Sequence, residues 1–213
     1  MGSIRRRAAI AEALAAILIA AAIIGQLVFS LSLEPPDVAF FLTNFFSFFT
    51  ILSNISAVLA LAWGAWYLWR AERFPTWFVT AFAAAVTYMA ATGIVYNTLL
   101  RGVSLDQEST LGWSNEVLHL VGPILVVGLW LLVQRRDALR WSHVFVAAVF
   151  PVVWAVYTLI RGALTGWYPY PFLNPAQPGG YGAVAVYVVA IAGIIIGIDA
   201  LLIWGSRRVR AGS

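Results

Sequence analysis

Two side chains in this sequence form the minimal set for nucleophilic acyl transfer, the hydroxyl of Thr50 and the imidazole of His119. In a dry pocket, an imidazole can take the proton of a hydroxyl while the hydroxyl oxygen attacks a carbonyl carbon. Thr50 belongs to a polar series spaced 4, 3 and 4 residues apart, which lies on one face of a continuous helix. The series is Thr43, Ser47, Thr50 and Asn54. Polar residues inside hydrocarbon are costly and tend to be functional, so the series marks a candidate site.

Further polar side chains near the same depth are suited to support this reaction. They are Asn54, Asn115, Glu116, Tyr96, Arg101, Tyr157 and Arg161. An asparagine amide or a tyrosine hydroxyl can donate a hydrogen bond to the oxyanion that develops during the attack. Glu116 and the two arginines can orient the base or hold a carboxylate of the substrate. Pro123 lies four residues after His119, so it predicts a kink that frees the His119 carbonyl.

Each of these residues also has a structural interpretation. A threonine in a membrane helix commonly bonds to its own backbone or joins two helices, and a lone histidine near a helix start is often interfacial. Glu116 at headgroup level favours a solvated role. Asp199 lies in the inner part of the last apolar segment, where we expect it to pair with Arg207 or another arginine of that side.

Six long apolar segments must position these residues. They run roughly over 8–33, 38–69, 74–100, 113–133, 144–160 and 181–204. Most reach the ~20 residues that a helix needs to cross the hydrocarbon core, and the alternating strands of a membrane β-barrel are absent. The chain is 62% apolar and only 10% charged, unlike a soluble domain. The sequence predicts an all-α integral membrane protein in which residues 1–213 form one domain of six transmembrane helices.

The arginines give this bundle an orientation. The chain has 13 arginines and no lysine, and eleven of the arginines lie before the first segment or after the second, fourth and sixth. Only Arg101 and Arg161 lie on the other side. The positive-inside rule therefore predicts that both termini are cytoplasmic. The loops on the opposite side carry acids, Asp106 and Glu108 among them. The use of Arg, Ala, Gly and Val without Lys favours a bacterial source, and we expect the protein in the bacterial cytoplasmic membrane.

This topology brings the candidate residues into one leaflet. With 1.5 Å of rise per residue, Thr50 is expected about 15 Å below the outer surface and His119 about 9 Å, a difference that helix tilt can remove. His143, by contrast, is expected near the cytoplasmic surface. The two histidines are the only ones, and the chain has no cysteine, which argues against a bis-histidine haem or a shared metal site. Topology accounts for the basic charge, so we expect no nucleic-acid partner.

Three motifs resemble one known family. Residues 48–51 read Phe-Phe-Thr-Ile, residues 113–119 read Trp-Ser-Asn-Glu-Val-Leu-His, and residues 165–173 read Thr-Gly-Trp-Tyr-Pro-Tyr-Pro-Phe-Leu. In this order they resemble motifs of the small multi-helix membrane proteins that include the androgen-induced gene product and the androgen-dependent TFPI-regulating protein. The third motif belongs to the segment 162–180, whose prolines forbid a regular helix and predict a structured cap.

The resemblance implies a chemistry. Animal members of that family are threonine hydrolases that cleave fatty acid esters of hydroxy fatty acids with a threonine nucleophile and a histidine. Carried over by motif, these roles fall on Thr50 and His119. The sequence departs from the family at Ile51, at Glu116 and at Arg161, which lies where family members carry histidine.

We therefore expect an intramembrane lipid ester hydrolase that needs no cofactor. The ester carbonyl would lie near Thr50, and any free carboxylate of the lipid near Arg101 or Arg161. The alternative is a protein that binds or transports a lipid or small molecule in the same polar cavity without catalysis. A scaffold subunit, a third possibility, predicts no cavity at all.

Overall fold

The computed structural model describes residues 2–103, 110–133 and 139–211. Within these residues every regular element is helical, and six helices are long and apolar enough to cross a membrane. This confirms the predicted fold class. The α-helices are α1 Gly2–Leu31, α2 Val38–Phe45, α3 Phe49–Trp69, α4 Thr76–Val95, α5 Gly112–Glu116, α6 Gly122–Leu132, α7 His143–Thr165 and α8 Gly180–Ala211. Two π-helical turns, η1 Tyr96–Leu100 and η2 Val117–Val121, and one 3-10 turn, η3 Pro171–Leu173, complete the set.

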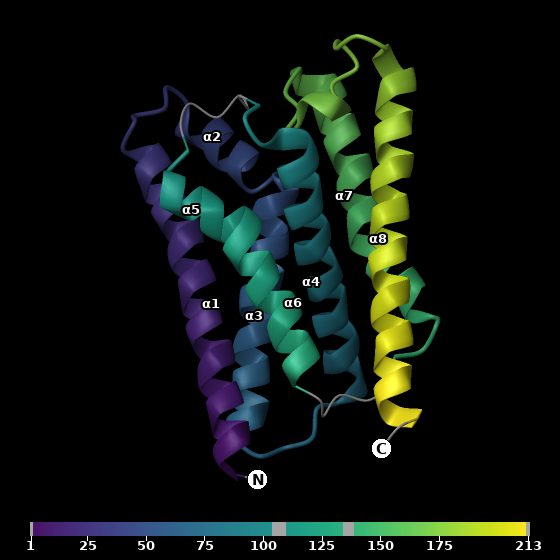
Figure 1. The fold of residues 1–213 in the computed structure, drawn as a ribbon. Helices are drawn as coiled ribbons and strands as arrows, with labels where there is room; N and C mark the ends of the chain where they lie inside the picture. Colours follow the sequence, from purple (N-terminus) through teal and green to yellow (C-terminus); the bar gives the residue numbers. More distant parts are fainter. Residues whose placement is uncertain (1, 104–109, 134–138, 212–213) are drawn as a thin grey trace.

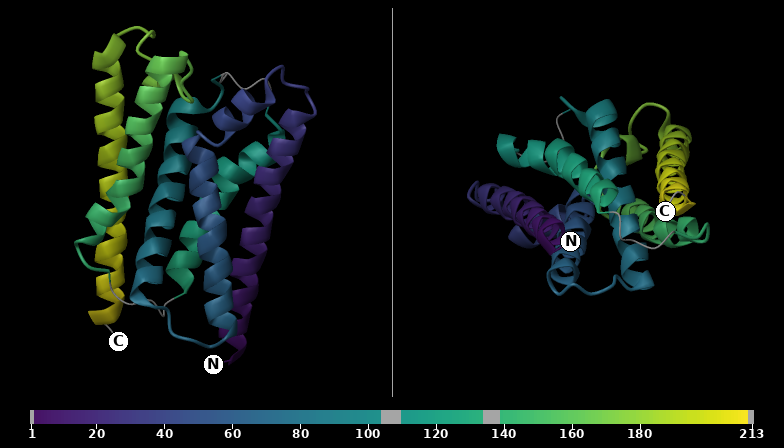
Figure 2. Two further views of the ribbon diagram at one scale, coloured as in Figure 1. Left: turned by 180° about the vertical axis from the view of Figure 1, so that it is seen from behind. Right: turned by 60° about the horizontal axis from the view of Figure 1, so that its bottom comes forward.

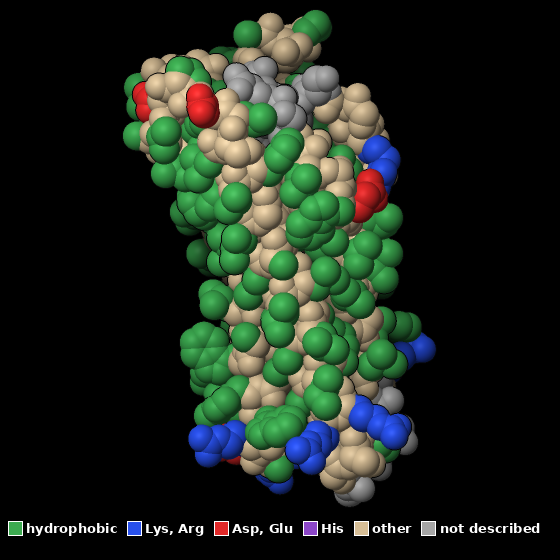
Figure 3. All heavy atoms as spheres, turned by 90° about the vertical axis from the view of Figure 1, so that its left-hand side faces the viewer, with side chains coloured by type: hydrophobic (Ala, Val, Ile, Leu, Met, Phe, Trp, Pro, Cys, Tyr) green, Lys and Arg blue, Asp and Glu red, His purple; other side chains and the backbone are tan. Residues whose placement is uncertain are grey.

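Both chain termini lie at the same end of the bundle (Figure 1). We call this the arginine-rich end, because basic side chains gather there below a broad apolar belt (Figure 3). Arg5 donates from Nε to the Leu68 carbonyl at 3.0 Å, and Arg207 donates from Nε to the Leu139 carbonyl at 3.0 Å. Arg135 and Arg136, like Asp106 and Glu108, lie outside the described residues. The membrane face that this end contacts stays a prediction.

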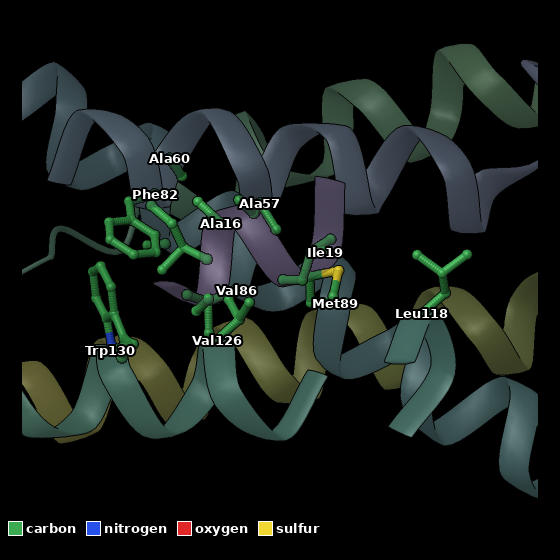
Figure 4. Close-up of a cluster of buried hydrophobic side chains, with 14 of the residues drawn as sticks. Ala16, Ile19, Ala57, Ala60, Phe82, Val86, Met89, Leu118, Val126 and Trp130 are labelled. Atoms are coloured by element: carbon green, nitrogen blue, oxygen red, sulfur yellow. The ribbon is translucent and has the colours of Figure 1, made fainter. Parts of the chain in front are cut away.

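The apolar core lies where α1, α3, α4 and α6 meet (Figure 4). Ile19, Phe82, Met89 and Val126 are fully buried there. Helix α4 is the most buried of the six long helices, because it packs against α3 and α6 on one side and against α7 and α8 on the other. Helices α7 and α8 form a pair beside it (Figure 2). Helix α4 is therefore the element against which both halves of the bundle are positioned.

The second apolar segment is two helices rather than one. Helix α2 begins at the N-cap Asp37, whose side chain accepts from Phe40 N at 2.9 Å, and the chain leaves helical geometry at 46–48. Side chains of α7 bond this corner, since Trp154 Nε1 donates to the Ser47 carbonyl at 2.9 Å. The prediction of one helix over 38–69 was wrong, because residues distant in sequence hold the break. Helix α2 lies across the end opposite the termini (Figure 1), which we call the cap end.

The segment between α7 and α8 completes the cap end, as its prolines predicted. Helix α7 ends at Gly166, which adopts a left-handed conformation with φ of +74° that glycine accepts without strain. The chain then passes through η3 and enters α8 at Gly180. Tyr170 and Leu173 are buried, so this segment packs onto the helices instead of extending away from them.

Candidate functional site

The hydroxyl of Thr50 and the ring of His119 meet at the cap end. Thr50 Oγ1 lies 3.2 Å from His119 Nε2. The other ring nitrogen, Nδ1, lies 3.0 Å from the carbonyl oxygen of Asn115. A carbonyl only accepts, so Nδ1 carries the proton of the neutral ring and Nε2 is left as an acceptor. Thr50 then donates its hydroxyl proton towards Nε2, which is the arrangement that a general base requires.

The break before α3 decides where Thr50 lies. Because α3 begins at Phe49, Thr50 belongs to its first turn and not to the middle of a membrane span. The depth of about 15 Å was counted along one continuous helix, and the break removes the basis of that count. In the first turn the backbone N–H of Thr50 has no intrahelical acceptor; it donates to the hydroxyl of Tyr170 at 3.2 Å. The first-turn position leaves both the hydroxyl and the amide of Thr50 available to other elements.

The π-helical turn η2 places His119. Pro123 lacks the N–H that would bond the His119 carbonyl, as the sequence predicted. The helix widens over Val117–Val121, and Asn97 Nδ2 donates to the freed carbonyl at 3.0 Å. The same amide donates to the Gly93 carbonyl at 2.7 Å. The histidine is thus fixed through its backbone by an asparagine of η1.

The ring of His119 is also held on its face. The Tyr96 ring stacks on it with centroids 3.7 Å apart and an interplanar angle of 22°. Asn115 Nδ2 donates to the Tyr96 hydroxyl at 2.6 Å, while the Asn115 carbonyl accepts from the imidazole. Two of the predicted supporting residues therefore orient the imidazole, one through its ring and one through its backbone.

Tyr170 belongs to the site although its type and spacing did not mark it. Its hydroxyl lies 3.3 Å from Thr50 Oγ1 and accepts from Thr50 N. The residue is buried, and this burial raises the pKa of its hydroxyl above the ordinary value, so the hydroxyl keeps its proton at neutral pH. The signal that could have found it is its place inside the third family-like motif, at 165–173.

Asn54 joins two helices, and its amide bonds neither the Thr50 hydroxyl nor the His119 ring. Its Nδ2 donates to the Thr50 carbonyl at 2.8 Å and to the Leu118 carbonyl at 3.1 Å. Both amide hydrogens are thereby used on backbone oxygens. The residue holds the first turn of α3 against η2, which keeps Thr50 and His119 at bonding distance.

The charged candidates bond neither the Thr50 hydroxyl nor the His119 ring, although Arg101 Nε donates to Asn97 Oδ1 at 2.9 Å. Arg101 forms a bidentate ion pair with Glu116, with N···O distances of 2.9 and 3.0 Å. Arg161 Nη2 donates to Asn44 Oδ1 at 2.6 Å. Tyr157 bonds the Ser47 hydroxyl at 2.9 Å. Arg161 and Tyr157 thus hold α7 against the corner between α2 and α3. The geometry brings neither arginine into contact with Thr50.

A cavity of about 220 Å³ adjoins Thr50 and lies between α4, α7 and α8. The lining residues with polar side-chain atoms are Thr50, Thr92, Tyr96, Trp154 and Tyr170. All the others are apolar, and no charged residue is among those that the structure places in the wall. A second hollow of about 290 Å³ adjoins it at the cap end, with Leu100 and Phe172 lining both.

A second histidine cluster lies between α4, α7 and α8, towards the arginine-rich end. His143 Nδ1 lies 2.8 Å from Asp199 Oδ1, and Nε2 donates to the Thr80 carbonyl at 2.8 Å. Thr87 Oγ1 donates to Asp199 Oδ1 at 3.2 Å. The expected pairing of Asp199 with Arg207 was wrong, because α7 brings an imidazole to the carboxylate. The two histidines lie at opposite ends, and the described residues contain no group of three potential metal ligands.

Comparisons of the chain with protein-family models, with curated proteins and with solved structures gave no match. The family resemblance of the three motifs therefore stays a prediction, and the site is interpreted from its geometry. That geometry is a hydroxyl on a neutral imidazole, a buried tyrosine hydroxyl beside it, and an apolar cavity next to both.

Proposed function

We propose that the protein is an intramembrane lipid ester hydrolase with Thr50 as nucleophile and His119 as base. One observation carries the proposal. Thr50 Oγ1 lies 3.2 Å from an imidazole nitrogen that is free to accept, because the other ring nitrogen is held by the Asn115 carbonyl. Thr50 is also one of the residues that line the apolar cavity. These are the same two residues to which the family resemblance assigns the reaction.

The reaction proceeds in two steps. Thr50 Oγ attacks the ester carbonyl as His119 Nε2 takes the hydroxyl proton, and the tetrahedral intermediate then expels the alcohol, which receives that proton from His119. The product is an acyl-threonine ester. In the second step His119 takes a proton from water, the resulting hydroxide attacks the acyl carbon, and Thr50 leaves with the proton. The sum is one ester and one water converted into one acid and one alcohol.

Tyr170 is the best-placed donor to the developing oxyanion. Its hydroxyl lies 3.3 Å from the attacking oxygen, and the residue lines the cavity. Asn54 is unsuited because both its amide hydrogens bond backbone carbonyls. The Asn115 amide is engaged by Tyr96. A preorganised donor of this kind contributes roughly 10²- to 10³-fold to the rate in other acyl transfers.

The substrate reaches the site from the bilayer. Val152 of α7 and Ile196 of α8 both line the cavity and are 59% and 49% exposed, so the cavity opens towards the face that lipid chains contact. We place the site in the outer leaflet, as the positive-inside rule predicts. The carboxylate docking expected at Arg101 and Arg161 has no support in the cavity wall, because these cations are paired elsewhere.

The test is covalent labelling of the purified protein in detergent with a fluorophosphonate probe. We expect labelling of the wild type, none of Thr50→Ala or His119→Ala, and partial recovery in Thr50→Ser, which keeps the hydroxyl. Thr43→Ala is the matched control, because Thr43 lies in the same polar series but bonds its own helix at the Ala39 carbonyl. Retention of full labelling in Thr50→Ala would overturn the assignment.

The same cavity could serve binding or transport without catalysis, and the labelling separates the two functions. A wild type that binds a fluorescent fatty acid but gives no labelled adduct, with its helical content intact, contradicts the hydrolase and favours the binding protein. A scaffold subunit receives no support from a bundle that holds a cavity beside its polar cluster.

A further inference from the structure

We propose that the cavity between α4, α7 and α8 is an acyl pocket of limited depth, which selects esters of a single uncharged chain of about four to eight carbons. The inference rests on the proposed function, because it names the substrate class of that site. It draws on the hydrogen bonds that close the inner end of the cavity, on the height of Thr50 above that end, and on the cavity volume.

Two bonds between helices close the cavity towards the arginine-rich end. Tyr88 of α4 donates to the Ala147 carbonyl of α7 at 2.9 Å, and Thr87 of α4 donates to Asp199 of α8 at 3.2 Å. The Ala147 carbonyl is available because Pro151 lacks the N–H that would bond it. Both bonds lie in a buried layer that ties all three helices together. This layer is the floor of the pocket.

The innermost lining residues lie at or within about one turn of these bonds. They are Ala91 of α4, Ala148 of α7, and Ile195 and Ile196 of α8. Ala91 and Ile195 are buried, so between the helices the pocket ends against packed side chains, while the half-exposed Ile196 lies at the side from which the ester enters. Two small residues and Ile195 therefore form the closed part of the floor, and its depth can be altered by substitution in either direction.

The height of Thr50 above the floor follows from the cross-helix contacts. Ser53 bonds Thr92 at 2.9 Å, which sets α3 and α4 in register. Because the two helices run in opposite directions, Thr50, three residues before Ser53, lies level with Val95. Four residues of α4 separate Val95 from Ala91, a rise of about 6 Å. An extended chain with carbon–carbon bonds of about 1.5 Å covers that rise with roughly five carbons.

The cavity has room for a chain of this length. Its volume of about 220 Å³ is well above the ~10–15 Å³ that a single water-sized group needs. The lining offers no charged partner to a carboxylate, which restricts the acyl half to hydrocarbon. In the opposite direction, the second hollow carries the amides of Asn174 and Gln177. The alcohol half of the ester thus points to the cap end and the acyl half to the floor.

The experiment compares p-nitrophenyl esters with acyl chains of about 2 to about 16 carbons, using the purified full-length protein in detergent. We expect kcat/KM to be highest between about four and eight carbons and to fall roughly tenfold or more for the longest chains. Ala148→Phe raises the floor and moves the optimum to the shortest esters. Ile195→Ala lowers the floor and moves the optimum towards longer chains.

The control is Val149→Phe, which adds the same bulk next to Ala148 on the outer face of α7. Val149 is 60% exposed and does not line the cavity, so the optimum stays where it is in the wild type. Thermal unfolding of each variant checks that it is folded. If Ala148→Phe does not fold, Ile195→Ala still tests the proposal.

The two proposals fail in different ways. Hydrolysis that is equally fast for all chain lengths, or an optimum that neither floor variant moves, overturns the pocket of limited depth and leaves the hydrolase standing. Displacement of a fluorescent fatty acid by free acids, measured in parallel, reports binding without turnover. A displacement optimum at about four to eight carbons with no ester cleavage supports the pocket while contradicting the hydrolase.

Discussion

Two histidine clusters lie within one bundle and differ in what surrounds them. In both, one ring nitrogen donates to a backbone carbonyl, that of Asn115 for His119 and that of Thr80 for His143. The second nitrogen of His119 faces the hydroxyl of Thr50, a residue that lines a cavity. The second nitrogen of His143 faces a carboxylate that is only 1% exposed. The first imidazole thus lies beside a cavity, and the second is enclosed with its partner.

The comparison indicates a candidate functional site at Thr50 and His119 and a structural contact between helices at His143 and Asp199. Asp199 and His143 carry opposite charges when the imidazole is protonated, and Thr87 supplies a further hydrogen bond to the carboxylate. Removing one member of such a buried pair destabilises a protein, because the remaining charge is left without a partner. The Thr50–His119 pair is neutral before the reaction, and in the proposed first step the imidazole becomes positive while the negative charge develops on the oxyanion of the ester. Under the proposed function, it is access to substrate rather than residue type that distinguishes the two clusters.

The largest expected effect comes from exchanging each histidine for glutamine. His119→Gln removes the base and should lower ester hydrolysis by roughly 10²- to 10⁴-fold with little change in unfolding. His143→Gln should leave the rate per folded molecule nearly unchanged but destabilise the protein by about 3–5 kcal/mol, because it leaves the Asp199 carboxylate unpaired. Rate measurements and denaturant unfolding in detergent, made on the same samples, report the two effects separately.

The double variant His143→Leu, Asp199→Leu is the control for this prediction. Replacing both members of a buried pair with apolar residues is often neutral or stabilising, so stability should return. The rate should stay at the wild-type level for the shortest esters, which do not reach the floor that Asp199 helps to close. Loss of hydrolysis in a folded His143→Gln protein would instead assign a part in turnover to the inner cluster, and the two clusters would no longer be distinct in function.

The sequence predicted helix type and membrane character because apolar length and charge bias are local properties. The same topology placed Thr50 and His119 in one leaflet, and the family-like motifs selected these two residues from the other polar side chains there. The break at 46–48 could not be predicted in this way, because Trp154 and Arg161 of α7 hold it from more than a hundred residues away. The partner of Asp199 was missed for the same reason.

Tyr170 could not be found from the polar residues expected inside the membrane-spanning segments. It belongs to a proline-rich segment outside the long helices, so it was not among the candidates. Its burial and its two contacts with Thr50 depend on how the cap packs on the bundle. A segment that lies outside the spans in sequence can therefore supply a side chain to a site between them.

An intermediate effect is expected from removing the side chains that bond the two backbone carbonyls left free by Pro123 and Pro151. Asn97 of η1 bonds the first carbonyl and Tyr88 of α4 bonds the second. Asn97→Leu orphans the His119 carbonyl and Tyr88→Phe orphans the Ala147 carbonyl. Each should cost about 1–3 kcal/mol of stability, as buried acceptors without a donor do. Only Asn97→Leu should also slow hydrolysis, by roughly tenfold, because a small displacement of the base is amplified in the rate.

The readouts are again unfolding and hydrolysis, each corrected for the folded fraction. Asn97→Asp tests whether the lost hydrogen-bond donor or the changed shape of the side chain is responsible. It keeps the shape but removes the donor, so its stability and its hydrolysis rate should resemble those of Asn97→Leu. Equal slowing by Tyr88→Phe and Asn97→Leu would mean that the α7 kink shapes the acyl pocket as strongly as the η2 turn positions the base.

The smallest effect is expected at the ion pair between Arg101 and Glu116, although both residues are close to the base in sequence or space. The pair is exposed to solvent, where opposite charges contribute little, and the Glu116 carboxylate raises the pKa of Arg101 without bonding His119. Glu116→Gln should change the hydrolysis rate by about twofold at most. Salt of about 1 M, which shortens the range of electrostatic interactions to about 3 Å, should change the wild-type rate by the same small factor.

A large loss of rate in Glu116→Gln that salt does not reproduce would contradict this prediction. It would mean that the bidentate ion pair fixes Arg101, whose Nε bonds Asn97 Oδ1, and that Asn97 in turn holds the carbonyl of His119. The boundary of the site would then extend from the buried imidazole to the surface, and the contrast with the enclosed His143 cluster would be one of connection to the surface as well as of access to substrate.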